Sequence, residues 1–352
     1  MPLHGERANG RGMASRREAE ARSTLRARAA EGEAAERFFF ALTSRAMAEK
    51  VACLHHGKVD VLRHGQASQR LESPYQQQRA TSNAGQADAR IVSVTRGRTS
   101  GELCYAIQGP TASNVFAQVP GSGREQQLFH GQGSHLSELD FSFADEALAC
   151  TVSGARGTSA IGVLRDDGKG VRTVTEGDVI DRAPRWTPGG RSEIVYASAG
   201  IGRTKTGRAV GRSPFALHRL RFSDNSVEVL MADAQYDYTA VVAVSETLLY
   251  ALRRRYDRTF PPSPLTRVHA VFRGLFAGAA SARARTGQAH ELVRITPEGA
   301  QLVAQDVLAF DVAANGDIVY SNAAGVFEIA ARETTPEPIL ALPYVEQLVI
   351  YW

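Results

Sequence analysis

The chain of 352 residues has no run of eighteen apolar residues, so the sequence does not predict a transmembrane helix. It also lacks the Gly-x-Ser-x-Gly elbow of α/β-hydrolases and the His-Glu-x-x-His pair of zinc peptidases. Cysteine is scarce: Cys53, Cys104 and Cys150 show no metal-ligand spacing, and each falls in an expected strand. We interpret them as small buried side chains in a reducing compartment. The net charge of +4 is too small to indicate a nucleic-acid partner by itself.

The sequence does contain a recurring strand phrase, in which an apolar strand, a tight polar turn and a second apolar strand are followed by a hairpin. Copies occupy residues 139–151, 184–196 and 310–320. The final segment, Val345–Tyr351, is a first strand without its second, and candidate partners lie near the start of the chain, around Val51–Leu62. A chain whose two ends complete one repeat closes into a ring, and closure is how a β-propeller removes its edge strands.

We therefore predict an all-β fold, a six-bladed β-propeller over residues 49–352 that is closed by pairing of the C-terminal strand with N-terminal strands. A helical insertion is expected near residues 260–286, because an apolar stripe of helical spacing follows a proline run there. Residues 1–48 are rich in Arg, Ala and Glu and predict a helical or disordered extension. One hypothesis is that Met47, just before the first strand, is the natural start.

The repeat length agrees with this architecture. Leu103, Leu148 and Ile194 occupy matching positions at intervals of roughly 45 residues, which is within the range of propeller repeats. A β-sandwich is the rival all-β interpretation. It would need neither repeats of one pattern nor a last repeat split between the two ends of the chain.

One copy of the phrase resembles a known family. Residues Arg182–Gly190, followed by Ile194–Tyr196, are similar to the repeat of TolB-type, WD-like propellers, whose usual form is Asp-x-x-Pro-x-Trp-Ser-Pro-Asp-Gly and an apolar strand. Asp181 stands at the leading acid, while Thr187 and Gly189 replace the usual Ser and Asp. The resemblance is to bacterial members of this class and covers about residues 49–352. It implies a six-bladed fold and often a protein-binding role, and it carries no catalytic residues.

The propeller topology predicts where binding residues gather. Loops between second and third strands lie on the same face as the links between blades, and long loops on a rigid scaffold commonly carry binding residues. The insertion falls on this face, and its stripe consists of Val268, Phe272, Leu275 and Phe276. Three interpretations stay open: a helix that packs on the propeller's own rim, a docking helix for a partner protein, and a helix lying on an anionic membrane surface.

A basic loop over residues 200–213 falls on the same predicted face. It superficially suggests a phosphate-binding loop, but no helix is expected to begin at its end, so a mobile basic loop is the preferred interpretation. Its charges favour an acidic protein partner, and because aromatic residues are not interleaved with them, nucleic acid is disfavoured. The basic residues that we assign to partner binding are Arg203, Lys205, Arg208 and Arg212.

Acidic residues and histidines occur on successive links between blades and could converge at the mouth of a central channel. Converging carboxylates can hold a divalent cation or a polar ligand, whereas isolated Asp residues in links usually accept backbone N–H bonds in turns. The residues concerned are His130, His135, Asp178, Asp181, Asp233 and Asp237.

Taken together, these patterns predict a non-catalytic protein-interaction scaffold or binding module in the cytoplasm, with no cofactor. The alternative is a metal-dependent hydrolase or lactonase-like enzyme with a divalent cation at the channel mouth, since several six-bladed propellers have such activities.

Overall fold

The computed structural model describes residues 50–63, 66–82, 89–165, 170–189, 192–257, 290–331 and 333–351. The chain divides into two compact units, Met1–Ala48 and Glu49–Trp352, and every described residue belongs to the second. The expected extension over residues 1–48 and the expected helix near residues 260–286 lie outside the described residues. Among the helices that are described, none has the length and apolar character needed to cross a membrane.

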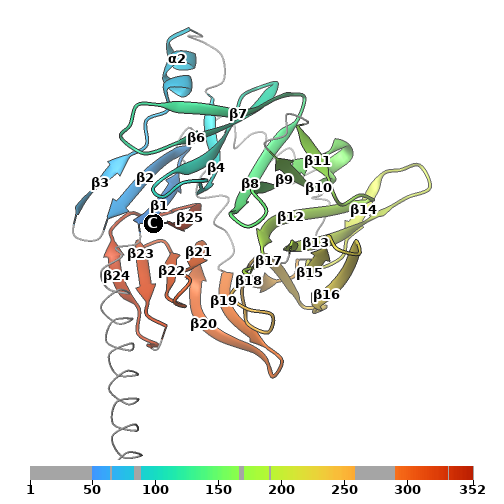
Figure 1. Ribbon diagram of the computed structural model, residues 1–352. Coiled ribbons are helices and arrows are strands. Elements are labelled where there is room, and N and C mark those ends of the chain that lie inside the picture. Colours follow the sequence, from blue (N-terminus) through green and yellow to red (C-terminus); the bar gives the residue numbers. More distant parts are fainter. Residues whose placement is uncertain are drawn as a thin grey trace, which may run out of the picture. The chain divides into compact units, whose positions relative to one another are not determined.

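Nearly all described elements are strands, and they form groups of mostly four strands that are consecutive in the chain, apart from the C-terminal β25, which belongs to the first group (Figure 1). The first group is β25 (Gln347–Tyr351), β1 (Lys50–His55), β2 (Lys58–Arg63) and β3 (Gln66–Arg70). The second is β4 (Arg90–Arg96), β5 (Leu103–Gln108), β6 (Ala112–Gln118) and β7 (Glu125–Gln132). The third is β8 (His135–Ser142), β9 (Ala147–Ser153), β10 (Ser159–Arg165) and β11 (Val171–Thr173).

The fourth group is β12 (Val179–Trp186), β13 (Glu193–Arg203), β15 (Ala216–Arg221) and β16 (Ser226–Met231), with β14 (Ala209–Arg212) paired to the end of β13. The fifth is β17 (Tyr236–Ala243), β18 (Leu249–Arg255), β19 (His290–Thr296) and β20 (Gly299–Val307). The sixth is β21 (Ala309–Val312), β22 (Ile318–Ser321), β23 (Val326–Ile329) and β24 (Glu337–Leu340). A single parallel bridge, Ser159 to Ile180, joins the third and fourth groups into one nine-stranded sheet.

The C-terminal strand pairs with N-terminal strands, as the sequence predicts. Strand β25 lies antiparallel to β1, with Ala52 opposite Val349 and Cys53 opposite Leu348. Segments nearly three hundred residues apart in sequence therefore form one four-stranded sheet. The apolar character of both strands explains the pairing, because Ala52, Cys53 and Leu348 are fully buried.

The aspartate of the recurring phrase ties the first strand of one group to the first strand of the next. Asp140 of β8 accepts a hydrogen bond from the backbone N–H of Trp186 in β12, at 2.7 Å. Asp311 of β21 accepts one from the N–H of Ile350 in β25, at 2.8 Å. A buried N–H that cannot find a partner in its own sheet is costly, so these carboxylates stabilise the junctions between groups.

Neutral side chains make the same kind of tie at two further junctions. The hydroxyl oxygen of Ser93 in β4 accepts a bond from the N–H of Leu139 in β8, at 2.8 Å. The amide of Gln347 in β25 bonds both the N–H and the carbonyl of Val94 in β4, at 3.0 and 2.8 Å. The junctions from first to second, second to third, third to fourth and sixth to first group are thus each tied by a side chain.

The hydrophobic core is divided into clusters that lie between consecutive groups. One cluster joins the third and fourth groups through Ile161, Trp186 and Ile194. Another joins the sixth and first groups through Val319 and Leu348. The remaining clusters fill the other junctions in the described part of the chain. Each group is therefore held by apolar contacts with the groups before and after it.

Two local features differ from the sequence-based expectation. The link after β3 contains a helix, α2 (Pro74–Ser82), which apolar periodicity does not predict because the helix is almost entirely polar. Ser73 precedes it, and its hydroxyl accepts the N–H of Gln76 at 3.2 Å, so capping chemistry rather than an apolar face marks its start. The segment over residues 200–213, expected as a mobile loop, forms paired strands instead.

Candidate functional site

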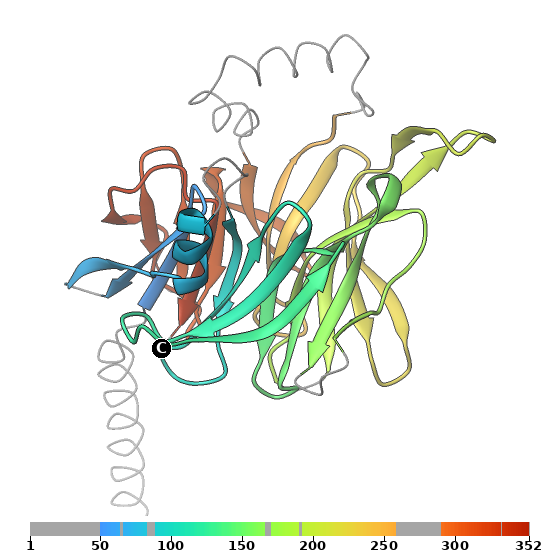
Figure 2. The same cartoon turned by 90° about the horizontal axis from the view of Figure 1, so that it is seen from above.

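The predicted basic loop is a two-stranded ribbon. Residues 201–203 at the end of β13 pair with β14, and a tight turn closes the ribbon, in which the N–H of Thr204 bonds the carbonyl of Arg208 at 2.8 Å. Gly207 adopts a φ of +79° in this turn, a conformation that glycine accepts without steric cost. Figure 2 shows the ribbon projecting beyond the sheet from which it starts.

The four basic residues predicted to bind a partner do not form one patch. Arg203 forms an ion pair with Asp178, with 2.7 Å between Nε and Oδ1, and Arg212 is buried in a second ion pair. Lys205 and Arg208 are exposed near the tip of the ribbon. Only these two of the four therefore present their charge to solvent without a carboxylate partner among the described residues.

At the base of the ribbon, Arg212 is held in a buried pair with Asp237 of β17. Its two terminal nitrogens lie 2.7 and 2.6 Å from the two carboxylate oxygens, a bidentate geometry. The Asp237 side chain is 1% exposed and also accepts the N–H of Phe215, at 2.9 Å. The guanidinium stacks 4.7 Å from the Phe215 ring and 5.1 Å from that of Tyr256, whose hydroxyl donates to the Arg212 carbonyl.

Two further arginines lie beside this pair. Arg254 of β18 places its Nε 3.7 Å from Asp237 Oδ2, beyond hydrogen-bond distance. Arg182 of β12 lies 6.0 Å from the Phe215 ring and donates to Glu138 of β8, at 2.6 Å. We call Arg182, Arg212 and Arg254 the arginine cluster. Its members belong to the fourth and fifth groups of strands, and the contact of Arg182 with Glu138 reaches the third.

Glu138 is the second carboxylate of this region. Besides Arg182, it accepts the Thr151 hydroxyl and the N–H of Ala183, each at 2.7 Å. Burial alone would raise the pKa of Glu138, but the Arg182 charge and these hydrogen bonds hold it below its usual value. Glu138 and Ala183 both have positive φ, at +53° and +51°, where the register of their strands shifts. The contact between Glu138 and Ala183 therefore joins two strand irregularities, one in β8 and one in β12.

His290 begins β19 next to the arginine cluster. Burial, followed by the Arg254 and Arg182 charges, lowers its pKa to about 4, and the charge of Asp237 partly opposes this shift. The imidazole is therefore neutral at pH 7. Three polar atoms here are buried and have no hydrogen-bond partner in the described part of the chain: Arg182 Nε, Arg254 Nε and His290 Nδ1.

The residues predicted to meet at a channel mouth are dispersed into separate contacts. Asp178 and Asp237 pair with arginines, and the carboxylate of Asp233 accepts the N–H of Gln235 at 2.7 Å, as in an ordinary turn. His130 donates to Asn114 at 2.7 Å, and His135 accepts from Gln108 at 2.9 Å. Across the residues that the structure describes, no three His, Cys, Asp or Glu side chains are placed to hold a metal ion.

Asp181, the remaining member of that set, is buried inside the fourth group. Burial raises the pKa of the Asp181 carboxyl, and hydrogen bonds from Ser198 and Thr175 partly oppose this rise. Burial also lowers the pKa of the nearby His218 imidazole. The Oδ1 atom of Asp181 has no hydrogen-bond partner among the described residues. Asp181 therefore sits within one sheet rather than with the other predicted ligands.

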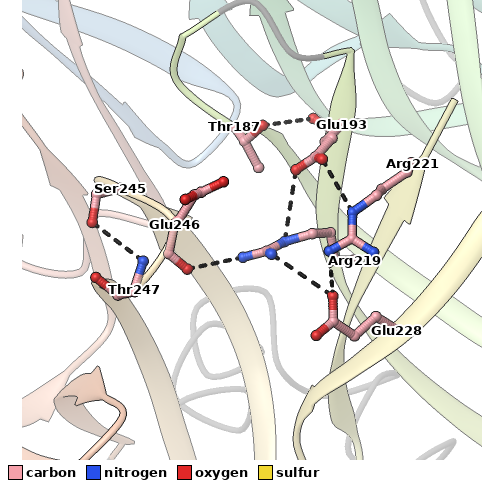
Figure 3. A network of polar contacts seen from close by, with 8 residues as sticks. All are labelled: Thr187, Glu193, Arg219, Arg221, Glu228, Ser245, Glu246 and Thr247. Carbon is pink, nitrogen blue, oxygen red and sulfur yellow. Dashed lines mark hydrogen bonds and ion pairs between the residues drawn. The ribbon is translucent and has the colours of Figure 1, made fainter. Parts of the chain in front are cut away.

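A second charged network, shown in Figure 3, contrasts with the arginine cluster. Arg221 lies 3.2 Å from Glu193 and 2.6 Å from Glu228, and Arg219 faces the same two carboxylates at 3.8 and 3.7 Å. Arg219 also donates to the carbonyl of Glu246, in the turn after β17, at 3.1 Å. Two arginines meet two glutamates here, so the network ties adjacent strand groups without an excess of charge.

Several residues of the candidate site were not predicted. Sequence patterns assign Arg212 and Asp237 to separate sites, place Arg254 in a possible basic patch with Arg212, and assign Glu138, Arg182 and His290 to neither. A usable signal exists in the run from Arg253 to Arg255, because three arginines at the end of an apolar strand need acidic partners nearby. The predicted stripe of Val268, Phe272, Leu275 and Phe276 lies outside the described residues.

No protein-family model matches the sequence, and no curated protein matches it either. Solved structures do match. A chain of the nidogen/laminin complex is similar with a TM-score of 0.55 at 9% identity, over 86% of this chain and 98% of that one. TolB from Acinetobacter baumannii is similar with a TM-score of 0.55 at 12% identity, over 86% of this chain; the match spans 66% of the TolB chain. The fold of this chain is thus a TolB-like propeller, and likenesses at this identity show the fold alone.

Proposed function

We propose that the chain is a closed six-bladed propeller of the bacterial TolB type that serves as a non-catalytic binding module. The pairing of β25 with β1 and the core cluster between the sixth and first groups support closure. The dispersal of the predicted metal ligands into ion pairs and turns gives the alternative, a metal-dependent hydrolase or lactonase-like enzyme, no support within the described residues.

The observation that carries this proposal is the construction of the β13–β14 ribbon. Its base is clamped by the buried pair of Arg212 with Asp237, while its tip exposes Lys205, Arg208 and the apolar Val210, which is 54% exposed. A preordered ribbon loses little conformational entropy on binding, and its charges attract an acidic surface. We infer that the ribbon contacts a protein partner that presents carboxylates around an apolar residue.

The other expectations stay part of the proposal. The insertion near residues 260–286 would add a docking helix on the same face or a contact with an anionic membrane surface. Nucleic acid is disfavoured, because the side chains of Arg203 and Arg212 are engaged by carboxylates and only two basic groups of the ribbon remain exposed. The expected location in the cytoplasm stays a prediction.

A charge-reversal experiment tests the ribbon. The variant Lys205→Glu/Arg208→Glu changes the tip, and the matched control Arg124→Glu/Arg172→Glu makes the same change in net charge at exposed positions outside the ribbon. Proteins cross-linked to the wild type in cells are identified by mass spectrometry and compared among the three forms. We expect one set of partners, rich in acidic surfaces, that the control retains and the ribbon variant loses.

Two results contradict the proposal. If the ribbon variant and the control retain the same partners, the ribbon is not the binding surface. If the wild type yields no partner above a charge-matched background, the chain is not a protein-binding module under the conditions of the assay. Circular dichroism of both variants checks that the fold is retained.

A further inference from the structure

We propose that Arg182, Arg254 and His290 form a binding site for an oxyanion, such as a phosphate or carboxylate group. The inference concerns the arginine cluster and does not require the protein partner proposed above. It rests on three buried polar atoms, Arg182 Nε, Arg254 Nε and His290 Nδ1, that have no hydrogen-bond partner among the described residues. Buried donors without partners cost free energy, and several in one place indicate a ligand that satisfies them together.

The strand register brings these groups to one place. Asp237 of β17 is opposite Arg254 of β18, and the last paired residues of β18 and β19 are Arg253 and Glu291, so Arg254 and His290 come directly beyond that pair. Residues opposite each other in antiparallel strands point to the same face of a sheet. Arg182 approaches from β12, which lies against β17. The proposed site is thus formed by Asp237, Arg254 and His290 from three strands of one sheet and by Arg182 from one strand of the neighbouring sheet.

The charges of the region favour an anion. The arginine cluster contributes three guanidinium groups, whereas the carboxylates that contact it are Asp237 and Glu138. Both carboxylate oxygens of Asp237 accept hydrogen bonds from Arg212, and the Nε atom of Arg254 lies 3.7 Å from Asp237 Oδ2. Three guanidinium groups therefore share two carboxylates, and Arg254 has only a long ion pair without a hydrogen bond to Asp237. A cation would be repelled from such a site, and the planar guanidinium fork suits phosphate and carboxylate geometry.

Two side chains of the proposed site are partly open to solvent. The side chains of Arg182 and Arg254 are 39% and 32% exposed, although the Nε atoms themselves are buried. The neighbouring Arg253 differs, since its Nε donates to Glu291 at 2.8 Å and its guanidinium stacks 4.4 Å from the Tyr236 ring. Arg253 is therefore a matched control for Arg254, because both are arginines of one strand and only Arg254 lacks a hydrogen-bonded carboxylate.

The first test uses inorganic phosphate and acetate as separate probes, each against sodium chloride of equal ionic strength. Binding is measured by titration calorimetry on the wild-type full chain, Arg254→Gln and Arg253→Gln. We expect Arg254→Gln to weaken phosphate binding by about tenfold or more, as for the loss of one charge-assisted hydrogen bond, and Arg253→Gln to leave it nearly unchanged. Binding of phosphate alone assigns the site to phosphate groups, and binding of acetate as well shows that a carboxylate suffices.

The second test needs no arginine variant. The His290 imidazole signal is assigned by NMR as the one lost in His290→Gln and is titrated with and without saturating phosphate. The charged groups that face it are Arg254 from β18, Arg182 from β12 and Asp237 from β17. A bound oxyanion stabilises the protonated ring, so its pKa should rise by about one unit from its low starting value. The proposal is overturned if neither probe binds, if both glutamine variants bind phosphate equally, or if the His290 pKa does not move.

Discussion

Replacing Asp237 by asparagine removes the charge of the most buried ion pair in the described part of the chain and nearly preserves its shape. Arg212, whose side chain is 9% exposed, would then keep a buried positive charge without its bidentate partner. Arg254, at 3.7 Å, would lose the nearest carboxylate as well. The N–H of Phe215 could still donate to the asparagine oxygen, so the substitution isolates the effect of charge from that of the hydrogen bond.

The expected loss follows from the burial of this pair. Breaking a buried ion pair from one side costs about 3–5 kcal/mol, because the remaining charge is left uncompensated. The stacking of Arg212 on Phe215 and Tyr256 survives the change and keeps the loss at the lower end, about 3 kcal/mol. For a propeller unit of this size, that loss corresponds to a decrease of about 5 °C in Tm.

The assay is urea unfolding followed by circular dichroism, on Asp237→Asn, Arg212→Met and the double variant. We expect Arg212→Met to be destabilising too, because it leaves the Asp237 carboxylate buried, and we expect the double variant to be clearly more stable than the sum of the two losses predicts. A coupling of about 2 kcal/mol is the expected sign of direct contact. Additive losses, or a change of less than about 0.5 kcal/mol for Asp237→Asn, would refute the reasoning.

Three further predictions follow from burial and packing. The pKa of His290 is about 4 in the fold and about 6.5 in the unfolded chain, so between these values the unfolded state binds the extra proton. The contribution of His290 to stability is therefore full above about pH 6.5 and is lost as the pH drops towards 4. Urea midpoints measured against pH should fall less in His290→Gln than in the wild type. Gly162→Ala should cost about 1–3 kcal/mol, because its new methyl would lie 2.6 and 2.7 Å from two valine methyls, whereas Gly200→Ala, with its nearest atom at 3.9 Å, should be nearly neutral in the same assay. Burial raises the thiol pKa to about 12 in all three cysteines, Cys53, Cys104 and Cys150. A thiol reagent at pH 8 should therefore label no cysteine in the native chain and all three in guanidinium, and rapid labelling of the native chain would contradict this.

The strand pattern was readable from the sequence because it depends on local order. The alternation of apolar strands and tight turns marked the four-stranded groups, and the unpaired Val345–Tyr351 predicted the pairing of β25 with β1. Helix α2 and the β13–β14 ribbon were missed for a shared reason. Neither has an apolar periodicity, and each depends on a cap or a cross-strand partner rather than on a buried face.

The candidate site was less predictable, since it depends on which charges meet. Sequence patterns assigned Arg212 to a partner-binding patch and Asp237 to a metal site, yet in the fold each neutralises the other. The same holds for Arg203 and Asp178. Opposite charges that the fold brings together are buried as pairs, so charged residues that the sequence suggests for binding are already engaged in internal ion pairs.

The sequence by itself determined the fold class, the order of the strands and the C-terminal segment that pairs with the N-terminal strands, because hydrophobic periodicity is a property of neighbouring residues. Only the tertiary structure decided that Arg182, Arg254 and His290 meet beside an already satisfied ion pair. These residues come from three strands separated by long stretches of chain. Arg254 and His290 meet because β18 pairs with β19, and Arg182 joins them because β12 packs against β17 of the next sheet, an arrangement that no local pattern encodes.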